Sequence, residues 1–217
     1  MEINDSISHK DIWIKYFLTC LIGVVLAWVT HELLFNDELY FNALSAKLSD
    51  DVIQNIINQT NKWGWVGYVS LPFIYLLKFT LVTTCLSLGY FFAFNRFVFK
   101  KFFATVVFAE AIFLVSLLIR LLWFLVVQTH YDLNSLSVFT PLSAMNFADA
   151  EHTPLYWVYP LRTLNIFELI YWLLLAYGLS DSTGQPFGRS LGIVFFSYGM
   201  GLLLWIILVM FVTITYT

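Results

Sequence analysis

Five stretches of about twenty mostly apolar residues recur along the chain, and they limit its fold more than any other feature. A helix needs about this length to cross the hydrocarbon core of a bilayer. Because lipid offers no hydrogen-bond partner to the backbone, such stretches must be helical. We therefore predict an all-α polytopic membrane protein, one domain covering residues 1–217, with five transmembrane helices. The predicted helices cover residues 12–30, 72–94, 102–127, 161–180 and 190–213.

The composition indicates the same class of protein. Hydrophobic residues make up 60% of the 217 residues and charged residues 12%, with a mean hydropathy of +0.78. Such a chain leaves no room for a separate soluble domain. A net charge of −3 without a basic stripe argues against a nucleic-acid partner, so the indicated partner is the lipid bilayer. The polar start is unlike a cleavable signal, and we expect the first helix to be retained.

The connection at residues 95–101 carries the clearest signal for orientation. Arg96, Lys100 and Lys101 give it a charge of +3 within seven residues, and basic loops of membrane proteins stay in the cytoplasm. This orientation places six Lys and Arg residues inside and three outside. We therefore predict a multi-pass protein of a bacterial inner membrane, with a cytoplasmic N-terminus and an extracytoplasmic C-terminus. The outer loops then cover residues 31–71 and 128–160.

The first outer loop is polar overall, yet its apolar residues follow a helical spacing. We predict one or two short amphipathic helices here, with Ser49 as an N-cap between them. They could dock a partner or lie on the membrane, or they could form a packed segment that caps the helix bundle, and we favour the cap. Residues 63–68, with two tryptophans, are typical of an interfacial anchor, and Pro72 is then expected to open the second transmembrane helix.

Four charged residues lie well inside the predicted transmembrane helices, away from their ends, whereas Lys15 and Arg162 lie near a helix end. A charge at this depth is costly, so these side chains should face protein and seek partners. Counting about 1.5 Å per residue places Lys78, Arg120 and Glu168 at a similar depth and Glu110 deeper, on the cytoplasmic side. We therefore predict that Glu168 neutralises Lys78 or Arg120 or both. Glu110 is expected to lack a basic partner and to be protonated or to contact a hydroxyl group or water.

These charges allow two interpretations. Ionisable groups inside a membrane are candidates for a proton or ion pathway. They can equally form an ion-pair network that fixes helix packing. We favour the structural network, because transport pathways usually have helices broken near the midplane by Gly or Pro. The third and fourth predicted helices show no such break in the sequence.

Other residue clusters give no catalytic or metal-binding pattern. His130, Asp132, Glu151 and His152 share one outer loop, and His31 is predicted on the same side. Their spacings match no zinc-ligand pattern. The chain has no glycine-rich phosphate loop, nucleophile elbow or His-Glu-x-x-His motif. We therefore expect no enzyme activity, no metal and no cofactor.

The C-terminal half resembles the bacterial members of the Yip1-domain family. The similarity covers about 75 residues and lies in residues 140–143, 160–172, 175–180 and 189–193, the last of which lead into the final apolar stretch. The resemblance implies five membrane-spanning helices and a cytoplasmic N-terminus. It brings no established catalytic residues.

We therefore expect a non-catalytic scaffold or accessory subunit of an inner-membrane complex, with other membrane-protein subunits as partners. The alternative is a permease-like transmembrane subunit of a transporter. In that case the buried charges Lys78, Glu110, Arg120 and Glu168 would serve transport.

Overall fold

The computed structural model describes residues 9–46, 48–149 and 152–216. Within these residues the fold is helical and contains no strand, apart from one isolated backbone bridge between Ser143 and Asn165. The prediction of an all-α fold is confirmed. The helices of the first half are α1 (His9–Leu34), α2 (Asp37–Leu44), α3 (Asp50–Phe94), α4 (Phe99–Ala109), α5 (Ala111–Leu122) and the π-helix η1 (Trp123–Val127). Those of the second half are α6 (Leu133–Val138), the 3₁₀-helix η2 (Ala144–Phe147), α7 (Leu155–Thr163), α8 (Ile166–Thr183), α9 (Phe187–Val194), the π-helix η3 (Phe195–Gly199) and α10 (Met200–Tyr216).

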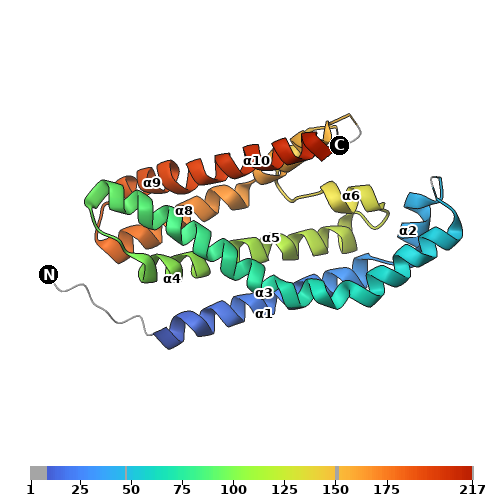
Figure 1. The fold of residues 1–217 in the computed structure, drawn as a ribbon, viewed down its shortest axis with the longest axis horizontal. Helices are drawn as coiled ribbons and strands as arrows, with labels where there is room; N and C mark the ends of the chain where they lie inside the picture. Colours follow the sequence, from blue (N-terminus) through green and yellow to red (C-terminus); the bar gives the residue numbers. More distant parts are fainter. Residues whose placement is uncertain (1–8, 47, 150–151, 217) are drawn as a thin grey trace.

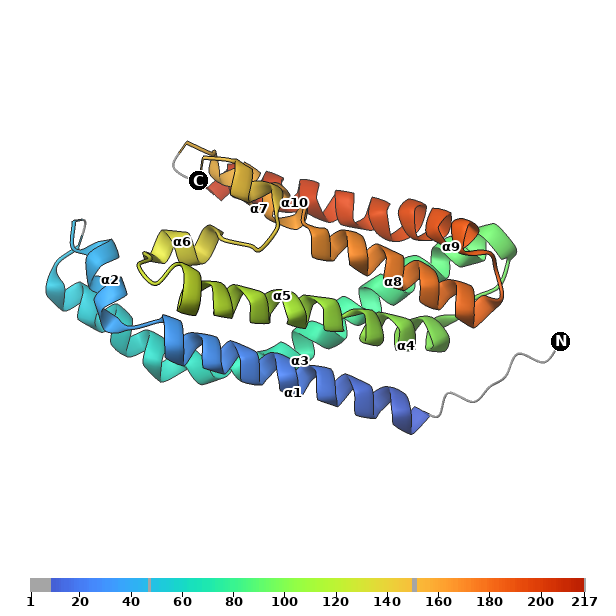
Figure 2. The ribbon, with the colours of Figure 1, turned by 180° about the vertical axis from the view of Figure 1, so that it is seen from behind.

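The long helices form rods that run back and forth along one axis (Figure 1). The rods are α1, then α3, then α4 with α5, then α8, and finally α9 with α10. The α3–α4 connection and the α8–α9 turn lie at the same end as the start of α1. Helices α2, α6 and α7 and the C-terminus lie at the opposite end (Figure 2). We call these the N-terminal end and the α6 end of the bundle.

Four helical segments are long and apolar enough to cross a membrane. Helix α8 is not one of them; it has 18 residues and carries Glu168 and Asp181. Four of the predicted crossings therefore have the expected helices, and the fifth is not confirmed. The four segments are Lys10–Leu34, Asp50–Phe94, Phe99–Val127 and Phe187–Tyr216.

Helix α3 differs most from the prediction. It is one continuous helix of 45 residues that begins after the predicted N-cap Ser49. Residues 63–68 and Pro72 lie inside it, so Pro72 does not open a new helix. The Pro72 carbonyl oxygen accepts a hydrogen bond from the Tyr16 hydroxyl of α1 at 2.6 Å, a tertiary contact at this point of the helix. At about 1.5 Å per residue α3 is about 68 Å long, roughly twice a bilayer core.

Two apolar clusters hold the rods together. The larger one joins α1, α3, α4, α8, α9 and η3 and includes the fully buried Phe79, Phe102 and Leu175. The smaller one lies at the α6 end, where Leu39 of α2 packs with side chains from α1, α5, η1 and α6. Helix α2 thus packs against the end of the bundle through Leu39, whereas the second predicted loop segment is the start of α3, and the prediction of amphipathic loop helices is not confirmed.

Small residues allow close contact between α3 and the last rod. A Cβ atom at Gly89 would lie 2.5 Å from Cβ of Ser197, and one at Gly201 would lie 3.2 Å from Sγ of Cys85. Neither glycine could therefore be replaced without moving its neighbour. The spacing of Ser197 and Gly201 along η3 and α10 serves packing within the chain.

Candidate functional site: a buried charge cluster

An ion pair joins α3 to the junction of α4 and α5. Nζ of Lys78 donates to both carboxylate oxygens of Glu110, at 2.7 and 2.9 Å. Glu110 is only 2% exposed, and the Lys78 ammonium lies 4.3 Å from the ring centroid of Phe113 and 5.8 Å from that of Tyr171. Glu110 is therefore buried, whereas the Lys78 side chain is 37% exposed and has aromatic rings beside its ammonium group. Burial of the carboxylate strengthens its attraction to the ammonium group.

The expectation that Glu110 lacks a basic partner is wrong. Lys78 lies 16 residues before the end of α3 at Phe94, and Glu110 lies 11 residues after the start of α4 at Phe99. The difference of 5 residues corresponds to about 7 Å along a helix. Two long side chains bridge that distance, so counting depth by residue number placed the two groups too far apart.

Glu168 has neutral partners. Its Oε1 accepts hydrogen bonds from the Tyr198 hydroxyl at 2.7 Å and from Nε1 of Trp172 at 2.9 Å. Among the described residues no Lys, Arg or His lies within 4.0 Å of its carboxylate. The predicted pairing of Glu168 with Lys78 or Arg120 is therefore wrong.

A helix start explains why Glu168 needs no cation. Helix α7 ends at Thr163, and Asn165 caps the start of α8 by accepting a hydrogen bond from the Glu168 backbone N–H at 2.8 Å. The positive end of the α8 dipole then favours a carboxylate in this first turn. Asn165 followed three residues later by Glu168 is a helix-start pattern that the sequence displayed and that would have divided the predicted helix 161–180.

Tyr171 lies between the two carboxylates. It is fully buried, and its hydroxyl interacts electrostatically with both Glu110 and Glu168 while having no hydrogen-bond partner among the described residues. Its ring packs against Phe113 at 5.0 Å and Tyr198 at 5.5 Å. We define the central cluster as Lys78, Glu110, Glu168, Tyr171, Trp172 and Tyr198.

Arg120 does not belong to the central cluster. It lies in the last turn of α5, and its Nη2 donates a hydrogen bond to the Leu136 carbonyl oxygen of α6. Its Nε is buried and has no acceptor among the described residues. The four charges predicted as one network therefore divide into a central cluster and a separate arginine at the α6 end.

Helix irregularities occur beside the central cluster. Glu110 separates α4 from α5, and its carbonyl oxygen accepts from the Phe113 N–H at 2.9 Å, three residues on. Tyr198 lies in the π-helix η3, a rare geometry that is frequent at functional sites. Asn165 lies in the break between α7 and α8. The third and fourth predicted helices are therefore interrupted, at Glu110 and Asn165, and neither position is a Gly or Pro that the sequence would reveal as a break. The π-helix η3, which ends at Gly199, lies in the fifth predicted helix.

The residues predicted to set the orientation lie together. Arg96 and Lys100 are exposed and Lys101 is half-buried at the N-terminal end of the bundle, between α3 and the first turn of α4. Arg189 of α9 lies over the Phe94 ring at 5.4 Å from its centroid, so it belongs to the same basic end. The direction in which this end faces across a membrane stays a prediction.

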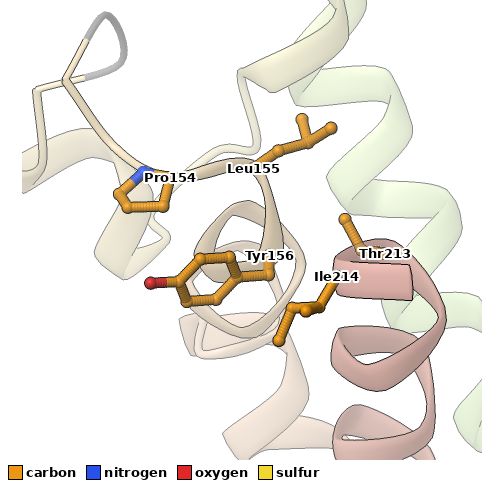
Figure 3. A pocket seen from close by; sticks show the side chains of 5 residues that line it. All are labelled: Pro154, Leu155, Tyr156, Thr213 and Ile214. Atoms are coloured by element: carbon orange, nitrogen blue, oxygen red, sulfur yellow. The ribbon is translucent and has the colours of Figure 1, made fainter. Parts of the chain in front are cut away.

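A cavity of about 310 Å³ lies away from the central cluster, between α7 and the end of α10 (Figure 3). It is lined by Pro154, Leu155, Tyr156, Thr213 and Ile214 and holds no charged side chain. Among the described residues, no three of the His, Cys, Asp and Glu side chains gather as metal ligands. His152 pairs with Asp149 at 2.7 Å, while Glu151 lies outside the described residues.

Comparison of the chain with protein-family models, curated proteins and solved structures gives no match. The resemblance to the Yip1-domain family stays a prediction. The features that bear on function are therefore those of the chain itself: the central cluster, the length of α3 and the two differently charged ends of the bundle.

Proposed function

We propose that the protein is a non-catalytic scaffold or accessory subunit of a bacterial inner-membrane complex, related to the Yip1-like membrane proteins. In this proposal α8 is a fifth crossing, supported by its position as a rod antiparallel to its neighbours (Figure 1). The N-terminus is cytoplasmic and the α6 end faces outward, as the basic N-terminal end favours.

The length of α3 is the observation that carries this proposal. His31, near the end of α1, contacts Tyr68 of α3 with ring centroids 6.5 Å apart. The turns of α3 well before Tyr68 therefore extend past the end of α1 (Figure 1). With α2 they form what we call the α2–α3 arm, residues 37–44 and 50–62. A helix that only crossed the membrane would not need these turns.

The surface of the arm fits a protein partner with a basic face. Ile53 and Ile57 are buried where the arm folds together, so its apolar side is used internally. The exposed side is acidic, with Lys62 as its basic residue among those described. The acidic side chains on the arm and beside it are Glu32, Asp37, Glu38, Asp50 and Asp51, all exposed.

The central cluster supports a structural role for the buried charges. Lys78 of α3 and Glu110 of the α4–α5 junction neutralise each other, and Tyr198 of η3 bonds to Glu168 of α8. These contacts join four of the rods by directional bonds. Removing either member of the ion pair would strand a charge, so the cluster specifies one packing of the bundle.

Gentle extraction of the full-length protein tests the proposal. We expect it to leave the membrane with a stoichiometric partner, and we expect neutralisation of the arm by Glu32→Gln, Asp37→Asn and Glu38→Gln to lower partner recovery about tenfold, equivalent to about 1.4 kcal/mol. Asp181→Asn, an exposed acid at the N-terminal end, is the control. A protein that is monodisperse and alone after extraction contradicts the scaffold, and unchanged recovery in the triple variant contradicts docking at the arm.

A transporter subunit is the second candidate, and the interrupted helices favour it. Glu110, Glu168 and Tyr198 all lie at or beside irregular backbone, as substrate-binding groups of transporters often do. Reconstitution into proteoliposomes distinguishes the two. A coupled proton or ion flux that Glu168→Gln abolishes while the protein keeps its melting temperature would establish the transporter, as would a copurified ATPase.

A further inference from the structure

Two arginines come together at the α6 end without an acidic partner. Arg120 lies in the last turn of α5 and Arg162 in the last turn of α7, and both donate hydrogen bonds to the short segment 136–140. Among the described residues no carboxylate lies within 4.0 Å of either guanidinium. The central ion pair, by contrast, is neutralised within the chain.

The hydrogen bonds of both arginines converge on one short segment. Arg120 donates through Nη2 to the Leu136 carbonyl oxygen, and Nε of Arg162 donates to Oγ1 of Thr140 at 3.0 Å. These two acceptors are four residues apart, on α6 and the turn that follows it. The two guanidinium groups therefore approach the same segment from two different helices.

Most donors of the two side chains are unused. A guanidinium carries five N–H donors. The buried Nε of Arg120 has no acceptor, and neither terminal nitrogen of Arg162 has one among the described residues. The dipole at the end of α7 offsets part of the charge of Arg162. Helix α5 continues directly into η1, so Arg120 has no free helix end beside it, and its buried Nε is unsatisfied. A bound anion would offset the positive charge of both side chains and accept hydrogen bonds from the terminal nitrogens of Arg162.

The surroundings of the arginine pair suit a membrane interface. Phe147 of η2 is 94% exposed, and Leu142, Trp157 and Leu164 are also exposed. Such apolar and aromatic side chains beside buried cations are typical of the zone where lipid headgroups lie. The segment is held firmly, because the Ala144 N–H donates to the Leu164 carbonyl oxygen at 2.8 Å.

We propose that Arg120 and Arg162 form a binding site for a phosphate group at the α6 end of the bundle. Arginine matches the oxygens of phosphate with paired, charge-assisted hydrogen bonds, which a lysine cannot reproduce. The phosphate is supplied by the headgroup of an anionic phospholipid or by a free phosphate ion, and both offer the same oxygens to the two side chains. The site is separate from the α2–α3 arm.

Thermal melting of the full-length protein in a neutral detergent tests this site. We expect phosphatidylglycerol, but not phosphatidylcholine, to raise the melting temperature by about 5–10 °C at a hundredfold excess over the dissociation constant. A second series of melting measurements uses inorganic phosphate in place of lipid. Stabilisation by the lipid alone assigns the site to a headgroup, and stabilisation by inorganic phosphate as well assigns it to phosphate from either source.

Variants decide whether the two arginines carry the effect. Arg162→Gln should abolish the shift and Arg162→Lys should keep only part of it, whereas Lys62→Gln, an exposed cation of the arm, should keep all of it. Arg120 also bonds to α6, so replacing it could disturb the fold. The wild-type protein therefore supplies the second readout, which is retention of one phosphatidylglycerol in native mass spectrometry. Equal shifts in the wild type and Arg162→Gln, or no shift and no retained lipid in the wild type, would overturn the site.

Discussion

The central ion pair and the arginine pair at the α6 end both join charged side chains from two helices, but only the central pair balances its own charge. Lys78 and Glu110 come from different rods and satisfy each other, with Glu110 buried and the Lys78 ammonium group beside the Phe113 ring. Arg120 and Arg162 also come from different helices, but they share a sign and leave donors unused. The first site is complete within the chain, whereas the second is complete only with an added anion. Buried charge alone therefore does not indicate function, and its compensation must be examined at each site.

The largest effect is expected from a variant that breaks the central ion pair. Lys78→Met strands the Glu110 carboxylate in the interior, and we expect a loss of about 3–5 kcal/mol in the free energy of unfolding. The double variant Lys78→Met and Glu110→Leu removes both charges and should melt close to the wild type. Arg162→Met strands no charge and should cost far less. Melting of the purified variants in one detergent measures all three, and equal losses in the single and double variants would refute the pairing.

The sequence predicted the helical class, four of the five expected long apolar helices and the gathering of basic residues at one end. Each of these follows from local composition, because lipid requires internal backbone bonds and long apolar runs. Ser49 was likewise predicted as a helix N-cap, here of a short loop helix, and it occupies the N-cap position of the much longer α3, although its side chain makes no capping hydrogen bond.

The partners of the charges could not be predicted this way. The contact of Lys78 with Glu110 depends on the tilt and rotation of two rods, and counting residues along each helix gives no information on either. Helix α3 continues through Pro72, and the Tyr16 hydroxyl bonds to the Pro72 carbonyl oxygen there, a contact between two rods that no local pattern predicts. Only the break between α7 and α8 had a local signal, which is the helix cap at Asn165. The long apolar run around it led us to predict one continuous helix over residues 161–180.

Removing one hydrogen bond to Glu168 tests the second half of the central cluster. Tyr198→Phe deletes the hydroxyl that lies 2.7 Å from the carboxylate, and we expect a loss of about 1.5–3 kcal/mol because the acceptor is charged. Tyr171→Phe is the matched control. Its hydroxyl is buried without a partner, so its removal should be neutral or slightly stabilising. If chemical unfolding shows equal losses for both variants, the hydroxyl of Tyr171 has a role that the static contacts do not show.

Helices α4 and α8 are in close contact where Gly178 meets Thr105. A Cβ atom at Gly178 of α8 would collide with the Thr105 side chain of α4, so Gly178→Ala should cost about 1–3 kcal/mol. Adding Thr105→Ala should restore most of that loss. Gly188→Ala, where nothing lies within 4 Å, is the control at the N-terminal end. Melting temperatures that fall equally for the two glycine variants would show that α4 and α8 are not in close contact.

The smallest effect concerns α6, which the arginine pair holds from one side. Asp132 caps this helix, and its hydrogen bonds to Ser135 lower the pKa of the Asp132 carboxyl group below its ordinary value. Because the folded-state pKa is lowered, this stabilisation is present at neutral pH and disappears as pH falls below about 4. We expect Asp132→Ala to cost about 1 kcal/mol at pH 7 and Asp132→Asn, which can still cap, to cost less and to remove the pH dependence. Hydrogen exchange of the α6 amides at pH 7 and pH 3 measures this locally. The exchange rates are compared as protection factors, which correct for the intrinsic exchange rate at each pH. Lower protection at pH 3 in Asp132→Asn as well as in the wild type would place the pH-sensitive group elsewhere, whereas loss of the pH effect in Asp132→Asn would assign it to the Asp132 carboxyl group.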